Sequence, residues 1–132
     1  MAVVDASVWV SFINENDKFH DRANDILSSI ISQNERISIP ALALTEVAGV
    51  VKRTTQDQEA AFDAVRLIKS MKPEILFDFG KLEPIATRIA INYNVRGADA
   101  YYIAVAVFTE SSLYTFDNQQ GKAFEEMSKT WQ

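Results

Sequence analysis

Short apolar segments alternate along this chain with longer segments in which apolar residues recur at the spacing of a helix. The opening AVVD and the later segments RISIP, EILF and SSLYTFD are rich in β-branched and aromatic residues, which predicts buried strands. Between and after them, apolar positions repeat with the 3.6-residue period that predicts helices. We expect these helices over residues 6–14, 19–33, 41–52, 57–71, 81–93, 96–108 and 119–127.

Strands that alternate with helices predict a parallel sheet covered by helices on both faces. Pro40 is expected at the first position of the third helix, and residues 129–132 are expected to add a very short fifth strand. Ligands of such folds lie outside the carboxyl ends of the strands. Asp5 ends the first predicted strand and Asp117 ends the fourth, so we expect both side chains at one edge of the sheet.

The composition removes several classes of chemistry. The chain has 132 residues, 48% of them hydrophobic, which is enough for one globular domain over residues 1–132. It has no cysteine, which excludes disulfides, thiolate nucleophiles and cysteine-bound zinc. The single histidine, His20, cannot form a two-histidine acid–base pair. No apolar run is long enough to span a bilayer and the first residues lack a basic segment, so we expect a cytoplasmic protein without a membrane association.

The net charge of −5 argues against a protein that binds nucleic acid passively through a basic face. It does not argue against an enzyme that contacts phosphate through a bound metal ion.

Four acidic residues deserve comparison, because each has an ordinary structural explanation when taken alone. Asp5 can cap the helix that follows it, as Ser7 can, and Asp117 fits an Asx-turn or a helix cap. Asp99, in RGADAYYIAVAVF, is favoured by the dipole of the helix that it begins. Glu46 is harder to explain, since its helix is apolar on nearly every face.

Taken together, the four acids form a pattern that the predicted fold can gather at one edge of the sheet. Clustered carboxylates repel one another and persist only when they are protonated or neutralised by a cation. A site built from Asp and Glu oxygens suits Mg²⁺ or Mn²⁺ better than zinc. The sequence therefore predicts a divalent metal site formed by Asp5, Glu46, Asp99 and Asp117.

The order and context of these residues resemble the PIN-domain nucleases, especially the VapC-type toxins of bacterial and archaeal toxin–antitoxin pairs. The resemblance lies in the segments VVDASVWV, IPALALTEVAGVV, RGADAYYIAVA and LYTFD and covers essentially the whole chain. It implies a PIN-like three-layer α/β/α sandwich with a short, mostly parallel central sheet. It also implies metal-dependent hydrolysis of RNA phosphodiester bonds, with a small antitoxin as partner.

The resemblance assigns roles to individual residues. Asp5, Glu46, Asp99 and Asp117 would be the acidic catalytic and metal site, with Ser7 and Thr115 as supporting hydroxyls. Glu46 is either a metal ligand or the base that orients the attacking water, and both roles stay open. Two departures from the family pattern are Asn118, where some members have a further polar or acidic residue, and the short segment after the last predicted helix.

Contacts outside the acidic site rest on fewer signals. Arg96 precedes the Asp99 helix and can meet a substrate phosphate, although an ordinary solvated arginine explains it equally well. The apolar faces of the first helices indicate a homodimer or a bound antitoxin segment. The alternatives to a toxin are a non-catalytic PIN-like interaction module, an RNA-processing nuclease without a toxin role, and a receiver-like phospho-acceptor. The last of these lacks a lysine in the final strand.

Overall fold

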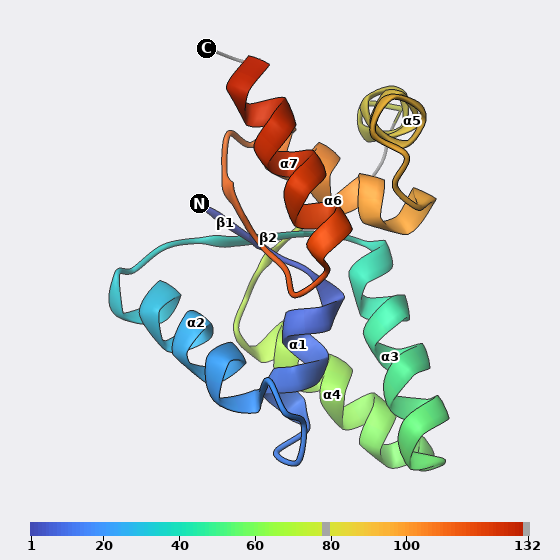
Figure 1. Cartoon of the computed structure of the whole chain (residues 1–132). Coiled ribbons are helices and arrows are strands. Elements are labelled where there is room, and N and C mark those ends of the chain that lie inside the picture. Colours follow the sequence, from blue (N-terminus) through green and yellow to red (C-terminus); the bar gives the residue numbers. More distant parts are fainter. Residues whose placement is uncertain (78–79, 131–132) are drawn as a thin grey trace.

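Four parallel strands form the centre of the protein in the computed structural model, which describes residues 1–77 and 80–130 (Figure 1). The strands are β1 (Ala2–Val4), β2 (Ile37–Pro40), β3 (Glu74–Leu76) and β4 (Ser112–Tyr114). Their order in the sheet is β3-β2-β1-β4, and every pairing between them is parallel. The predicted sheet is confirmed, and β1 and β2 form its interior.

Helices cover both faces of this sheet. In Figure 1, α1 to α4 lie on one side of the strands and α5 to α7 lie on the other. The structure is thus the expected three-layer α/β/α sandwich. The helices span α1 (Ala6–Ile13), α2 (His20–Ser32), α3 (Leu42–Thr55), α4 (Gln58–Ser70), α5 (Leu82–Tyr93), α6 (Gly97–Phe108) and α7 (Asn118–Thr130).

The core lies between the sheet and the helices that cover it. All three residues of β1 are fully buried, as expected for an interior strand of a parallel sheet. Helix α6 contacts β1, β2 and β4, and Ala100 and the run from Tyr102 to Ala106 have no exposed surface. A helix that is apolar on nearly every face has to be buried in this way. No helix in the described part of the chain is long and apolar enough to cross a membrane.

The register of the sheet brings distant segments together at its carboxyl edge. Val4 pairs with Tyr114 at the ends of β1 and β4, and the Asp5 amide continues this pairing by donating to the Tyr114 carbonyl at 3.0 Å. Residues that follow these two strands therefore leave the sheet side by side, at the edge where ligands of parallel sheets bind.

Three details of the sequence prediction are wrong. Pro40 does not open a helix: it is the last residue of β2 and pairs with Leu76, a strand end where a missing N–H costs little. Strand β4 ends at Tyr114, so Asp117 lies in the following turn, because the Phe116 amide donates to the Ser7 hydroxyl instead of to a strand. Residues 129–130 belong to α7, and residues 131–132 of the predicted fifth strand lie outside the described residues.

Candidate active site

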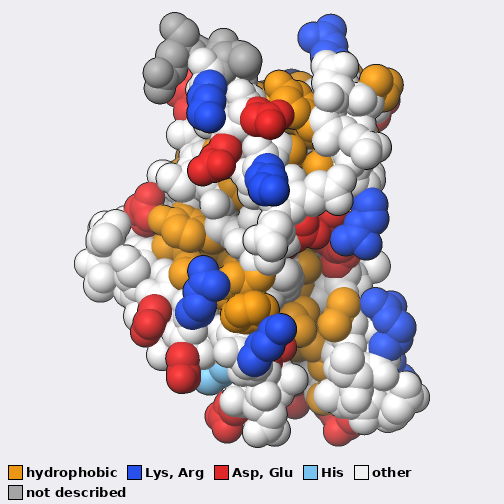
Figure 2. Space-filling view, viewed as in Figure 1, with side chains coloured by type: hydrophobic (Ala, Val, Ile, Leu, Met, Phe, Trp, Pro, Cys, Tyr) orange, Lys and Arg blue, Asp and Glu red, His pale blue; other side chains and the backbone are white. Residues whose placement is uncertain are grey.

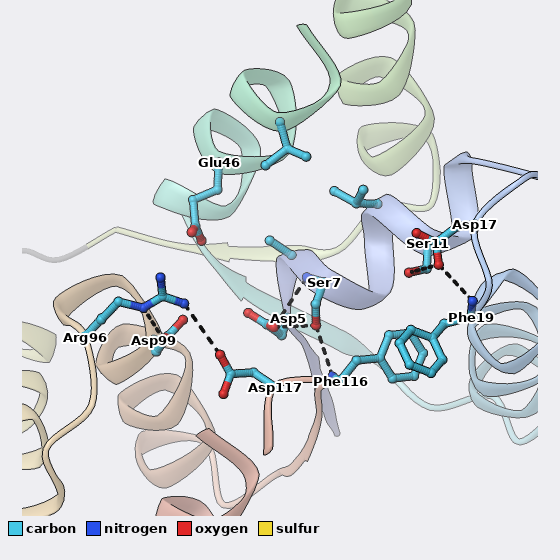
Figure 3. A pocket seen from close by; sticks show the side chains of 13 residues that line it. Asp5, Ser7, Ser11, Asp17, Phe19, Glu46, Arg96, Asp99, Phe116 and Asp117 are labelled. Carbon is cyan, nitrogen blue, oxygen red and sulfur yellow. Dashed lines mark hydrogen bonds and ion pairs between the residues drawn. The ribbon is translucent and has the colours of Figure 1, made fainter. Parts of the chain in front are cut away.

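The four acids of the sequence prediction line a single open cavity of about 460 Å³ at the carboxyl edge of the sheet. Asp5 follows β1, Glu46 comes from α3, Asp99 from the first turn of α6, and Asp117 from the turn before α7. Figure 3 shows these side chains converging from their four segments, with Arg96 among them. The fold thus brings together every acid that the sequence pattern singled out.

Asp5 is a helix cap and a lining residue of the cavity at the same time. Its side chain is buried, with 4% of the residue exposed, and Oδ2 accepts hydrogen bonds from the Ser7 hydroxyl at 2.6 Å and the Thr115 hydroxyl at 2.9 Å. The Ser7 amide also donates to Oδ2, at 3.3 Å, which caps α1. All of these bonds use one oxygen, so the other oxygen, Oδ1, accepts no hydrogen bond from residues 1–77 or 80–130.

Asp117 divides its two oxygens in a similar manner. Oδ1 accepts a 3.0 Å hydrogen bond from the Gln120 amide in the first turn of α7, which is the cap that the sequence allowed. Oδ2 faces the cavity and lies 3.5 Å from Arg96 Nη2. Capping a helix and lining the cavity are therefore compatible roles for Asp5 and Asp117, because each carboxylate uses one oxygen for the cap and has the other oxygen for the cavity.

Arg96 joins two of the acids. Its Nε lies 3.3 Å from Asp99 Oδ2, while its Nη2 reaches Asp117, so one guanidinium bridges the two carboxylates (Figure 3). The Arg96 side chain is 83% exposed, whereas that of Asp99 is only 15% exposed. Arg96 is thus a cation at the mouth of the cavity, and it is not simply solvated.

Glu46 is held by a tyrosine that the sequence analysis did not select. The Tyr102 hydroxyl donates a 2.6 Å hydrogen bond to Glu46 Oε1, and the Tyr102 ring has no exposed surface. Burial and the neighbouring Glu46 carboxylate raise the pKa of Tyr102 far above its ordinary value, so the hydroxyl stays protonated and donates. The spacing of Tyr102 within a buried helix indicated only a core residue.

The electrostatic environment of the cavity disfavours negative charge on two of its acids. Burial raises the pKa of the Glu46 carboxyl, and the charges of Asp5 and Asp99 add to this, while the Tyr102 hydrogen bond opposes it. Burial also raises the pKa of Asp99, with Asp117 and Asp5 as further causes and Arg96 as the opposing one. A cation in the cavity would stabilise the charged form of both carboxylates and so lower both pKa values.

Buried Gln120 is a second residue that sequence reasoning missed. It has no exposed surface, its Nε2 lies 3.4 Å from the Asp99 carbonyl, and its Oε1 lies 3.2 Å from the Thr115 hydroxyl. The glutamine thereby ties α7 to the start of α6 behind the acids. Its helical spacing from the apolar residues Ala123, Phe124 and Met127 was the available signal.

Solved structures share this fold. VapC20 of Mycobacterium tuberculosis, described as a toxin that cleaves the sarcin–ricin loop, superposes with a TM-score of 0.79 at 21% identity and covers 93% of this chain and 95% of its own. VapBC2 of Rickettsia felis, solved with a DNA fragment from its promoter, gives a TM-score of 0.72 at 16% identity, with 92% of each chain covered. FitAcB of Neisseria gonorrhoeae gives 0.72 at 20% identity, with 95% and 94% covered.

A sequence comparison with curated proteins finds no match. A family model described as the PIN domain, in contrast, matches residues 2–126, which include all four acids and the whole sheet. Since this match extends over nearly the entire chain and the fold is that of the VapC structures, the chain belongs to the PIN-domain family.

Proposed function

We propose that this protein is a ribonuclease that hydrolyses RNA phosphodiester bonds with Mg²⁺ or Mn²⁺, and that it is the toxin of a type II toxin–antitoxin pair. Membership of the PIN-domain family and the fold shared with VapC20, a toxin that cleaves the sarcin–ricin loop, support the class of reaction. The observation that carries the proposal is the convergence of Asp5, Glu46, Asp99 and Asp117 on one open cavity.

The chemistry of this cavity fits a hard divalent cation, which prefers carboxylate oxygens. Asp5 Oδ1 and Glu46 Oε2 accept no hydrogen bond from the described residues, and Asp99 and Asp117 already share a cationic group. Within residues 1–77 and 80–130, no three acidic or histidine side chains stand close enough together to hold an ion in the present arrangement. Binding would therefore require Arg96 to withdraw and the carboxylates to move inward.

The residues of the cavity would have different roles in the reaction. Asp5, Asp99 and Asp117 would be direct or water-mediated ligands, and Glu46 a further ligand or the base that orients the water. The bound ion would supply an activated water and neutralise charge on the phosphate and the leaving oxygen. Ser7 and Thr115 fix one oxygen of Asp5, and Tyr102 fixes one oxygen of Glu46. The other oxygen of each carboxylate would then be available to a metal ion or its bound water.

Arg96 would bind substrate. Its long exposed side chain pairs with two carboxylates at the mouth of the cavity, where an RNA phosphate would enter. With a divalent ion held by Asp99 and Asp117, the Arg96 guanidinium would be free to bind a phosphate oxygen.

The proposed partners are an antitoxin and a second copy of this chain. Large apolar side chains are exposed on several helices, which is the kind of surface that a partner covers. Those on helices of the described chain that are more than half exposed are Ile31, Phe62 and Ile91. If the chain is a toxin, its expression alone slows growth and the Asp99→Asn variant relieves this. Normal growth with well-expressed wild-type protein would favour the RNA-processing alternative.

Cleavage of RNA by the purified protein tests the catalytic proposal. We expect cleavage with Mg²⁺ or Mn²⁺ and none in EDTA, and a loss of at least about 100-fold in Asp5→Asn or Asp117→Asn, the scale of removing one major stabiliser of the transition state. Glu126→Gln, an exposed acid of α7 outside the cavity, is the matched control and stays active. Cleavage in EDTA would rule out the metal mechanism, and a folded protein without any cleavage would favour a non-catalytic module.

A further inference from the structure

Two phenylalanines from distant parts of the chain form the end of the acid-lined cavity that lies away from Arg96. Phe19 precedes α2 and Phe116 follows β4, and both line the cavity together with Asp5 and Ser7. Their ring centroids are 5.0 Å apart with planes inclined by 31°. Both side chains are half-buried, so part of the paired rings faces solvent.

Two basic side chains lie over these rings. The Arg22 guanidinium is 5.2 Å from the Phe116 centroid and 5.8 Å from that of Phe19, and Lys18 Nζ is 5.0 Å from the Phe19 centroid. Lys18 and Arg22 are exposed. On the face shown in Figure 2, basic and acidic side chains lie beside hydrophobic ones over α1 and α2.

Hydrogen bonds fix both phenylalanines relative to the acids. The Phe116 amide donates to the Ser7 hydroxyl at 3.0 Å, and the same hydroxyl donates to Asp5 at 2.6 Å. The Phe19 amide donates to Asp17 Oδ1 at 2.8 Å, an oxygen that also accepts from the Ser11 hydroxyl at 3.1 Å. The two backbones are therefore fixed, Phe116 next to Ser7 and Asp5 and Phe19 next to Asp17 and Ser11 (Figure 3).

We propose that Phe19, Phe116, Lys18 and Arg22 form a nucleotide subsite, which holds a base next to the cleaved phosphate of single-stranded RNA. A base would stack on the exposed part of the rings, where Arg22 now lies, and the two cations would bind the adjoining phosphates. Aromatic faces with flanking basic residues are the usual means of holding single-stranded nucleic acid without regard to sequence. The inference rests on the proposed function, because it takes RNA to be the substrate of the acidic cavity.

RNA fits this surface better than a hydrophobic segment of a protein. The rings open into a cavity that ends at four acids and an arginine, so a chain bound to them continues into the proposed catalytic site. Two exposed cations lie over one aromatic pair, although Asp17, which accepts from the Phe19 amide, lines the same cavity. A partner's aromatic side chain needs neither the cations nor the acids.

Binding measured in EDTA separates this inference from the catalytic proposal, because metal-dependent cleavage is then absent. The probe is a short single-stranded RNA with 2-aminopurine, whose fluorescence is quenched when the base stacks. We expect Phe19→Leu and Phe116→Leu to weaken binding by about fivefold or more and to reduce the quenching, in proportion to the loss of one stacked base. Lys18→Gln and Arg22→Gln should each lower the slope of log affinity against log salt by about 0.7.

The chain contains a matched control for the aromatic and for the basic substitutions. Phe62 and Arg66 on α4 form a similar pair, with the guanidinium 5.8 Å from the ring centroid, and neither lines the acid cavity. Phe62→Leu and Arg66→Gln should bind the probe like wild type. Unchanged binding in the Phe19 and Phe116 variants, or an equal loss in the α4 controls, would overturn the subsite even if the wild-type protein cleaves RNA. Loss of binding confined to the subsite would support it even if no cleavage is found.

Discussion

Arg96 Nη2 lies 3.5 Å from Asp117 Oδ2, although helix α6 and strand β4 separate the two residues in the sequence. The same guanidinium also reaches Asp99, so a positive charge already stands between two of the four carboxylates. A metal ion and this arginine would therefore compete for the same two acids. The competition is modest, because the arginine is largely exposed and solvent screens the pair.

Replacing Arg96 should accordingly strengthen metal binding. We expect Arg96→Gln to bind Mn²⁺ about two- to fivefold more tightly than wild type, the range that an exposed ion pair allows. In EDTA the same variant should melt at a lower temperature, because Asp99 and Asp117 lose their shared counterion. Isothermal titration and thermal melts measure both effects, with the exposed Arg88→Gln on α5 as control. Weaker Mn²⁺ binding in the variant would mean that Arg96 supports the metal site instead of competing with it.

Tyr102 offers a test of how Glu46 is positioned. Tyr102→Phe keeps the buried ring and removes the hydroxyl that donates to Glu46 and also interacts with the Ala6 backbone, so we expect the fold to remain at a cost of about 1 kcal/mol in unfolding free energy. The rate of RNA cleavage should fall roughly tenfold, as for other groups that orient a metal-site residue. The Tyr102 hydrogen bond lowers the pKa of Glu46, so its loss should move the acidic limb of the pH–rate profile to higher pH. An unshifted profile with a reduced rate would indicate a structural role alone.

The stability of the metal-free protein should depend on pH in a defined direction. Burial raises the pKa of Glu46 and of Asp99 in the folded state, so the folded protein binds protons more tightly than the unfolded chain. The free energy of unfolding therefore falls as pH rises from about 4, where unfolded carboxyls titrate, through the raised folded pKa values.

Removing either titrating group should reduce this loss of stability. In EDTA, the melting temperature should fall less between pH 4 and pH 7 for Glu46→Gln and Asp99→Asn than for wild type. At pH 7, Asp99→Asn should melt at a higher temperature than wild type. Glu126→Gln, on the exposed part of α7, should follow wild type. A lower melting temperature for Asp99→Asn at pH 7 would show that its place in the first turn of α6, and its pairing with Arg96, outweigh the repulsion.

The sequence predicts the sheet and the gathering of the acids because both follow from short-range patterns. Alternating strands and helices require parallel pairing, and parallel pairing sets the residues after β1 and β4 side by side. Asp5 and Asp117 could therefore be placed at one edge without any knowledge of side-chain positions. The end of β4 was misjudged because the Ser7 hydroxyl, far away in sequence, takes the hydrogen bond of the Phe116 amide.

Features that depend on tertiary contacts were not predictable in this way. Tyr102 and Gln120 follow the helical period of core residues, and only the packed structure reveals that their polar ends meet Glu46 and Thr115. The sequence analysis counted Phe19 in the second helix and Phe116 in the fourth strand, whereas the structure places both in turns, where their rings meet. The basic neighbours of Phe19 in the sequence were the one available sign of an unusual aromatic residue.

A calorimetric titration of the metal-free protein with Mn²⁺ tests the central claim, that Asp5, Glu46, Asp99 and Asp117 form a divalent metal site. We expect saturable binding to wild type and to Glu126→Gln. Asp99→Asn, which keeps the size of the side chain and removes a negatively charged ligand, should lose that binding and the thermal stabilisation that Mn²⁺ gives wild type. Saturable binding that is equal in wild type and Asp99→Asn, or no binding to folded wild-type protein, would contradict the account.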